Sequence, residues 1–228
     1  MNWLGQTLAS SLGKKLIMAI TGLFLILFLT GHLLGNLQLF NNDEGRAFNE
    51  YAKFMTTNPM VKALSYLTYF SIIIHTIYSL ILSIRNNKAR AIGYAVNNRS
   101  QNSVWYSRYM GILGTLLLIF IVIHMGDFWY TMHYGSIPSV EYDGGGSIKN
   151  LYLVVVEAFS QAWYVALYVI AMVALAFHLG HGASSAFQTL GLSHKKYTPF
   201  IKKIAVGYAI IVPVLFALMP IYMYIKSL

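Results

Sequence analysis

Five long segments of this sequence contain no charged residue, and no other feature constrains the fold as strongly. They are residues 16–42, 63–84, 109–126, 158–192 and 204–225. A helix needs about 17–25 predominantly apolar residues to cross the hydrocarbon core of a membrane, and each segment is long enough. Because the segments are continuously apolar rather than alternating, crossing helices are favoured over barrel strands.

The sequence therefore predicts an all-α, polytopic membrane protein, in which residues 1–228 form a single transmembrane domain. We expect its bundle of five transmembrane helices to span about residues 16–40, 62–84, 107–130, 154–186 and 203–226. Residues 134–150 include three consecutive glycines, and we expect them to form an irregular connection outside the membrane.

The composition excludes several classes of protein. Only 10% of the residues are charged, whereas soluble domains have about 25%, so charged side chains are too few to cover a soluble surface. The net charge of +9 does not indicate nucleic-acid binding, because the basic residues lie in short clusters beside the apolar segments. The absence of cysteine excludes disulfides, thiolate catalysis and iron–sulfur ligation by this chain.

Charge is distributed unequally between the two sides of the predicted bundle. The side that holds the N-terminus carries eleven basic residues and no acidic residue, whereas the opposite side carries seven acidic and five basic residues. Cytoplasmic loops of membrane proteins carry an excess of lysine and arginine. We therefore expect the N-terminus in the cytoplasm and the C-terminus outside.

Four histidines lie deep inside the apolar segments, one in each of the first four: His32, His75, His124 and His178. Ionisable residues at this depth are costly and are usually functional. Neutral imidazole is the usual axial ligand of haem that is held without covalent attachment. For any one of these histidines alone, hydrogen-bonded packing or a role in a proton path is an equally good interpretation.

Depth in the membrane sorts the four histidines into pairs. At a rise of about 1.5 Å per residue, His32 and His124 lie roughly 25 Å and 24 Å from the cytoplasmic face. His75 lies roughly 15 Å from that face, and His178, 13 residues before Gly191, is also nearer the cytoplasm. Antiparallel threading thus predicts two bis-histidine haems with irons on the order of 10–20 Å apart. His32 pairs with His124, and His75 pairs with His178.

Further residues near these histidines have more than one interpretation. His181 follows His178 by three residues and so lies on nearly the same helix face. It is interpreted as a partner of the ligand or of a haem propionate, or as a packing residue. Gly31 and Gly35 flank the histidine of the first segment, and Gly182 follows that of the fourth. These glycines would let a bulky ring approach the backbone, and close helix packing is an equal alternative.

Five motifs together resemble a known family. They are residues 11–23 (SLGKKLIMAITGL), 32–36 (HLLGN), 90–98 (RAIGYAVNN), 105–111 (WYSRYMG) and 178–191 (HLGHGASSAFQTLG). They are similar to the cytochrome b subunit of succinate dehydrogenase and fumarate reductase, of the single-chain, five-helix type that binds two haems. The resemblance covers essentially the whole chain.

The resemblance implies a set of haem ligands. Members of this family bind two haem b groups through axial histidines on their first four helices, and the matching positions here are His32, His75, His124 and His178. The family pattern places a glycine one turn after the fourth ligand and another 13 residues after it. Gly182 and Gly191 match those positions, which favours His178 over His181.

The resemblance also implies a function. The family anchors a flavoprotein with covalent FAD and an iron–sulfur subunit to the bacterial inner (cytoplasmic) membrane, and it exchanges electrons with quinone, often menaquinone. This chain would then be the anchor and electron-transfer subunit of succinate:quinone oxidoreductase, or of fumarate reductase. It would have no dicarboxylate site of its own, would contact lipid and its two partner subunits, and could join a higher oligomer of the complex.

Three carboxylates are candidates for a quinone site near the outer haem. Glu44 and Glu50 fall in the connection after the first span, and Asp127 follows His124 by about one turn. Solvated loop carboxylates are the simpler interpretation of Glu44 and Glu50. Asp127 could equally cap or solvate the end of the third span.

Two other functions fit the same residues. One is the dihaem subunit of another quinol-oxidising complex, such as a respiratory nitrate reductase. The other is a proton-coupled transporter that uses buried histidines. Reduced b-type absorption bands at about two haems per chain would support either cytochrome, and their absence would support the transporter.

Overall fold

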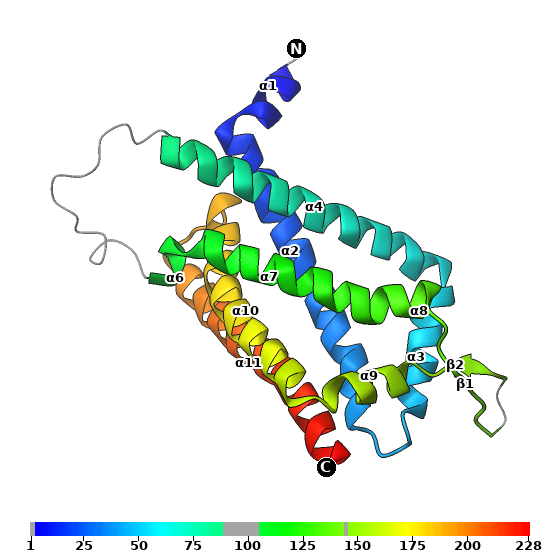
Figure 1. The fold of residues 1–228 in the computed structure, drawn as a ribbon. Coiled ribbons are helices and arrows are strands. Elements are labelled where there is room, and N and C mark those ends of the chain that lie inside the picture. Colours follow the sequence, from blue (N-terminus) through cyan, green and yellow to red (C-terminus); the bar gives the residue numbers. More distant parts are fainter. Residues whose placement is uncertain (1–2, 89–104, 144–145) are drawn as a thin grey trace. The chain divides into compact units, whose positions relative to one another are not determined.

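The computed structural model describes residues 3–88, 105–143 and 146–228, and over these residues the protein is built almost entirely of helices (Figure 1). The motif at residues 90–98 lies outside the described residues.

Within the described residues, five helices are long and apolar enough to cross a membrane. They are α2 (Ser11–Asn36), α4 (Pro59–Lys88), α7 (Met110–His124), α10 (Ala162–Thr189) and α11 (Thr198–Ser227). Helix α2 continues as the 3₁₀ turn η1 (Leu37–Phe40), and α7 continues through the π-helical turn η2 (Met125–Tyr130) into α8 (Thr131–Tyr134). The prediction of an all-α, membrane-spanning protein is confirmed at this level.

The remaining elements are short. In the described part of the chain these include the helices α1 (Trp3–Ala9), α3 (Arg46–Thr57), α6 (Trp105–Arg108) and α9 (Leu151–Phe159). Two strands, β1 (Ser139–Val140) and β2 (Ile148–Lys149), pair antiparallel, with Ser139 opposite Lys149 and Val140 opposite Ile148. The segment expected to be an irregular connection therefore contains a small hairpin.

The fourth crossing helix begins later than the sequence predicted. We expected one span over residues 154–186, but the helix is interrupted at Ser160 and Gln161, so α9 is separate and the crossing helix starts at Ala162. The Ser160 hydroxyl donates to the carbonyl oxygen of Glu157 at 2.7 Å, and the Trp163 indole donates to the side chain of Gln161 at 2.7 Å. Such local bonds compete with the helix ladder. The other four spans overlap the predicted ones and differ from them by a few residues at their ends.

Much of the surface of the crossing helices is apolar and exposed. Only 11–44% of the most apolar window of each helix is buried within the protein. The exposed side chains include Leu27, Ile73, Ile119, Ile170 and Ile211. Soluble monomers rarely expose contiguous apolar surface on this scale, so these faces suit contact with lipid.

The described elements belong to two compact units. The first unit comprises Met1–Phe28, Leu67–Thr115 and Ala176–Ile210, and the second comprises Leu29–Tyr66, Leu116–Leu175 and Ile211–Leu228. Each crossing helix contributes residues to both units. His75 and His178 belong to the first unit, and His32 and His124 belong to the second.

In the second unit, one buried side chain joins two helices and the loop after β1. Asn49 of α3 is 0% exposed. Its amide nitrogen donates to the Tyr142 hydroxyl and to Asn150 Oδ1, each at 2.9 Å, and its oxygen accepts the backbone N–H of Tyr152 at 2.8 Å. Asn150 in turn caps α9 by accepting the backbone N–H of Leu153. Asn49 therefore fixes α3 to the residues after β1 and to the start of α9.

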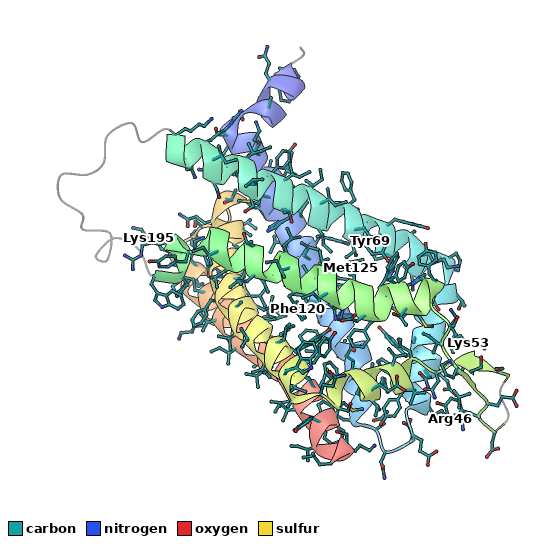
Figure 2. All side chains as sticks on the ribbon, in the orientation of Figure 1. Arg46, Lys53, Tyr69, Phe120, Met125 and Lys195 are labelled. Carbon is teal, nitrogen blue, oxygen red and sulfur yellow. The ribbon has the colours of Figure 1, made fainter. Side chains whose placement is uncertain are left out.

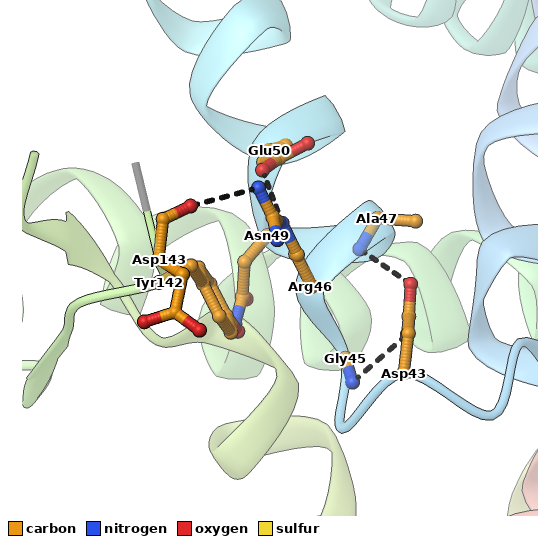
Figure 3. A network of polar contacts seen from close by, with 8 residues as sticks. All are labelled: Asp43, Gly45, Arg46, Ala47, Asn49, Glu50, Tyr142 and Asp143. Carbon is orange, nitrogen blue, oxygen red and sulfur yellow. Dashed lines mark hydrogen bonds and ion pairs between the residues drawn. The ribbon is translucent and has the colours of Figure 1, made fainter. Parts of the chain in front are cut away.

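The surface of this region is polar (Figure 3). Asp43 accepts the backbone N–H groups of Gly45 and Ala47, at the start of α3. Arg46 donates to Glu50 at 2.9 Å in an exposed ion pair, and the hydrogen bond to Glu50 raises the pKa of Arg46. Exposed pairs of this kind contribute little to stability, so the buried amide of Asn49 dominates the region.

Tyr51 of α3 packs against the backbone of α2 at Gly35. A Cβ atom at position 35 would overlap the Tyr51 ring, whose hydroxyl lies 3.5 Å from the carbonyl oxygen of Gly31. From the sequence, Gly35 was interpreted as making room either for a bulky ring or for a neighbouring helix. The structure places the ring of Tyr51 there.

We expect Gly35→Ala to destabilise the second unit by about 1–3 kcal/mol, because the half-buried Tyr51 ring must move away from α2. Thermal unfolding in detergent would measure the change. Gly207→Ala is the matched control, since nothing described lies within 4 Å of a Cβ atom there. Equal melting temperatures for the two variants would contradict the prediction.

Candidate functional site

The first unit brings together the histidines of α4 and α10. The ring centroids of His75 and His178 are 6.4 Å apart, and the ring planes are inclined by 63°. The side chains lie 103 positions apart in the sequence, so only the packing of the helices brings them together. This is one of the two pairs that the depth argument predicted.

The orientation of the His75 ring is fixed by α2. Its Nδ1 lies 3.2 Å from the carbonyl oxygen of Met18 and 3.2 Å from Thr21 Oγ1. The Thr21 hydroxyl itself bonds to carbonyl oxygens one turn back, at Ile17 and Met18. A carbonyl oxygen only accepts, so Nδ1 carries the proton and Nε2 keeps its lone pair. A hydrogen bond from the second ring nitrogen is the usual support for a metal-bound histidine.

Two glycines that the sequence interpretation did not single out border these rings. A Cβ atom at Gly22 of α2 would lie 3.2 Å from His75 Cε1, and one at Gly114 of α7 would lie 3.8 Å from His178 Cε1. Gly22 in particular leaves room for an imidazole that a larger residue would push aside. Each glycine lies on a different helix from the histidine that it borders. The sequence alone therefore gave no signal that would link them.

The second histidine of this pair has an unusual environment. His178 Nδ1 is buried, and among the described residues it has no hydrogen-bond partner. A buried polar atom without a partner costs about 1–3 kcal/mol, and such atoms in native proteins call for a physical explanation. His181 lies one turn further along α10 and is half-buried.

The second unit brings together the histidines of α2 and α7. The ring centroids of His32 and His124 are 5.7 Å apart, and the ring planes are nearly perpendicular, at 88°. This is the other predicted pair. Helix α10 completes the site, since the Tyr168 hydroxyl lies 3.2 Å from His124 Nδ1.

Aromatic side chains surround this second pair. The Phe120 ring stacks on His124 with centroids 5.6 Å apart, and Phe128 lies 5.4 Å from the same imidazole. Phe216 of α11 lies 5.7 Å from His32. Phe120 and Met125, which are labelled in Figure 2, mark the stretch of α7 and η2 around His124. Aromatic rings from α7, η2 and α11 therefore border both imidazoles.

The ring separations of the two pairs match those of two imidazoles on opposite sides of one metal ion. A bond from a metal to a histidine nitrogen is about 2.0 Å long, so two rings on opposite sides of one ion have centroids roughly 6 Å apart. In the part of the chain that the structure describes, no group of three or more histidine, aspartate or glutamate side chains could hold a metal ion. Each pair could therefore supply two imidazole nitrogens to a group that brings its other ligands with it, as a porphyrin does.

The three carboxylates considered for a quinone site have different surroundings. Glu44 is exposed in a turn with a φ of 56° just before α3. Glu50 pairs with Arg46 and lines an open cavity of about 270 Å³ together with Lys53 and Tyr142. Asp127 differs from both, because it accepts a hydrogen bond from the hydroxyl of Tyr164. It is therefore linked to the interior of the second unit, beyond the capping role considered from the sequence.

No family model, curated protein or solved structure matches this chain.

Proposed function

We propose that this chain is the membrane anchor and electron-transfer subunit of a succinate dehydrogenase, a succinate:quinone oxidoreductase. In this role it passes electrons between an iron–sulfur subunit and a membrane quinone through two haem b groups. The observation that carries the proposal is the pairing of the four membrane histidines. Each compact unit brings together one pair, at ring separations of 6.4 Å and 5.7 Å.

Each pair would hold one haem through one ring nitrogen of each histidine. His75 and His178 serve the first unit, and His32 and His124 serve the second. A bound haem supplies a centre that accepts and releases one electron. The chain's own residues orient the imidazoles, through Met18 and Thr21 for His75 and through Tyr168 for His124, and surround them with apolar side chains that exclude water.

The partners follow from the proposed role. The basic side of the chain, with the N-terminus, would face the cytoplasm of a bacterium and dock a flavoprotein that carries FAD and an iron–sulfur subunit. The C-terminus would lie outside. The quinone, which we expect to be menaquinone, would exchange electrons with the haem of the second unit, and the same complex could work as a fumarate reductase.

Purification of the chain from membranes tests the proposal directly. We expect a reduced b-type spectrum, a pyridine haemochrome content of two haems per chain, and co-purification of a flavoprotein and an iron–sulfur protein. Membranes that lack the chain should lose succinate:quinone activity. A preparation without b-type bands would favour the transporter. Two haems without a flavoprotein partner would favour another quinol-oxidising complex.

A further inference from the structure

A continuous line of hydrogen bonds in the second unit connects an exposed carboxylate with one of the paired histidines. The Tyr164 hydroxyl donates to Asp127 Oδ2. The hydroxyl oxygens of Tyr164 and Tyr168 are 3.2 Å apart, and that of Tyr168 is 3.2 Å from His124 Nδ1. His124 ends α7, Asp127 lies on η2, which continues α7, and both tyrosines lie on α10.

The local backbone explains why these side chains meet. Tyr164 and Tyr168 are four residues apart and so lie on one face of α10, and each is only 6% exposed. Asp127 follows His124 on the π-helical turn η2. A π-helical turn is wider than an α-helical one and is often found at functional sites. Here it directs the carboxylate and the imidazole toward the same two tyrosines.

The carboxylate sets the direction of every hydrogen bond in this line. An ionised aspartate only accepts hydrogen bonds, so Tyr164 uses its proton on Asp127. Tyr164 can then only accept from Tyr168, and Tyr168, with its own proton used, can only accept from His124. The proton of the imidazole is therefore held on Nδ1, and the lone pair remains on Nε2.

We propose that Asp127, acting through Tyr164 and Tyr168, orients the His124 imidazole and makes it a stronger donor to the haem iron of the second unit. Asp127 is thus a positioning residue that favours the ferric state and lowers the reduction potential of this haem. The inference rests on the proposed function, because it requires a haem at this site. Acceptors bonded to the outer nitrogen of a ligating histidine raise its basicity, and the potential of a haem responds to such contacts.

The first unit supplies an internal comparison. There the outer nitrogen of His75 faces the carbonyl oxygen of Met18 and the hydroxyl of Thr21. Both acceptors are neutral. We therefore expect the larger effect of Asp127 on the haem held by His32 and His124.

Redox titration of the purified complex, with the two haems resolved, tests this inference. Removing the acceptor in Tyr168→Phe should raise the ferrous-to-ferric ratio of the second-unit haem roughly tenfold at a fixed potential, which is about 59 mV for a one-electron couple. Asp127→Asn removes the charge with little change of shape and should shift the same haem in the same direction. The EPR g-values of that ferric haem should change with the potential, because they report the donor strength of the imidazole.

The decisive measurement combines the two variants. If the carboxylate acts through the tyrosines, Asp127→Asn should produce no further shift in a Tyr168→Phe background. Tyr208→Phe, which removes a tyrosine hydroxyl that donates to the Ile26 carbonyl oxygen of the first unit, is the matched control.

Three results would overturn the inference. The first is a reduction potential of the second-unit haem that shifts no more in Asp127→Asn and in Tyr168→Phe than it does in the control Tyr208→Phe. Another is an Asp127→Asn shift that persists in the Tyr168→Phe background, since the charge would then act through space. The third is an equal shift of both haems. Wild-type complex without any b-type haem would instead refute the proposed function.

Discussion

Replacing His124 by alanine should remove one of two b-type haems from the purified protein, or convert it to a high-spin form, while the other stays low-spin. In the dihaem protein that we propose, loss of one imidazole would leave one iron with a single histidine ligand. Because His32 faces the same site at 5.7 Å, His32→Ala should give the same spectrum and retain the same haem. Optical and EPR spectra, with pyridine haemochrome per chain, measure this.

The first-unit pair should behave in the same way with the other haem. His75→Ala and His178→Ala should match each other and retain the haem that the first two variants lose. His181→Ala is the matched control, one turn from His178 on α10, and it should keep both haems. Loss of the first-unit haem in His181→Ala but not in His178→Ala would show that the wrong histidine was chosen. Loss of one haem by both His75→Ala and His124→Ala would refute the pairing itself.

Asn49→Ala should cause the largest loss of stability outside the histidine sites. The substitution removes three hydrogen bonds of a fully buried amide and leaves the backbone N–H of Tyr152 without its acceptor. Unpaired buried groups cost about 1–3 kcal/mol each, so we expect about 2–4 kcal/mol in total. The melting temperature should fall by about 5–15 °C, measured by circular dichroism in detergent.

Asn41→Ala provides the control for this prediction. The amide of Asn41 donates to the side chain of Gln38 in an exposed position, so its removal should change the melting temperature very little. The cleavage rate of the β1–β2 hairpin by a protease should rise in Asn49→Ala alone, because Asn49 bonds to Tyr142 within that connection. A melting temperature equal to that of Asn41→Ala would mean that Asn49 is not the link between α3 and α9.

The crossing helices could be predicted from the sequence because a membrane imposes a length. Charged residues are too costly in the hydrocarbon core to interrupt a span, so the uncharged segments locate α2, α4, α7, α10 and α11. Because each helix crosses the same membrane, the depth of a residue can be counted along its helix and compared between helices. Counting residues from the flanking charges placed His32 level with His124 and placed His75 nearer the cytoplasm. Counting back from Gly191 placed His178 on the same side as His75, and each of these pairs is in ring contact.

What the sequence did not reveal depends on helix rotation and on local hydrogen bonds. Depth says nothing about which face of a helix meets which neighbour, so Gly22 and Gly114 could not be linked to the histidine rings. The break before Ala162 is hidden because α9 is as apolar as the helix that follows it. The line from Asp127 to His124 depends on the π-helical turn η2, and π-helical turns have no clear sequence signature.

The bond between His75 and the backbone of α2 has a consequence for how the protein tolerates mutation. A carbonyl oxygen is present whatever side chain position 18 carries, so substitutions at Met18 that preserve the helix leave the acceptor of His75 in place. In the second unit, the corresponding support passes through three side chains, and a change at any one of them interrupts it. The first site therefore keeps its backbone acceptor through single substitutions, and a change at Thr21 removes a side-chain contact of His75. Single substitutions can change the support of the second site. We therefore expect related chains to differ more in the redox properties of the second site than in those of the first.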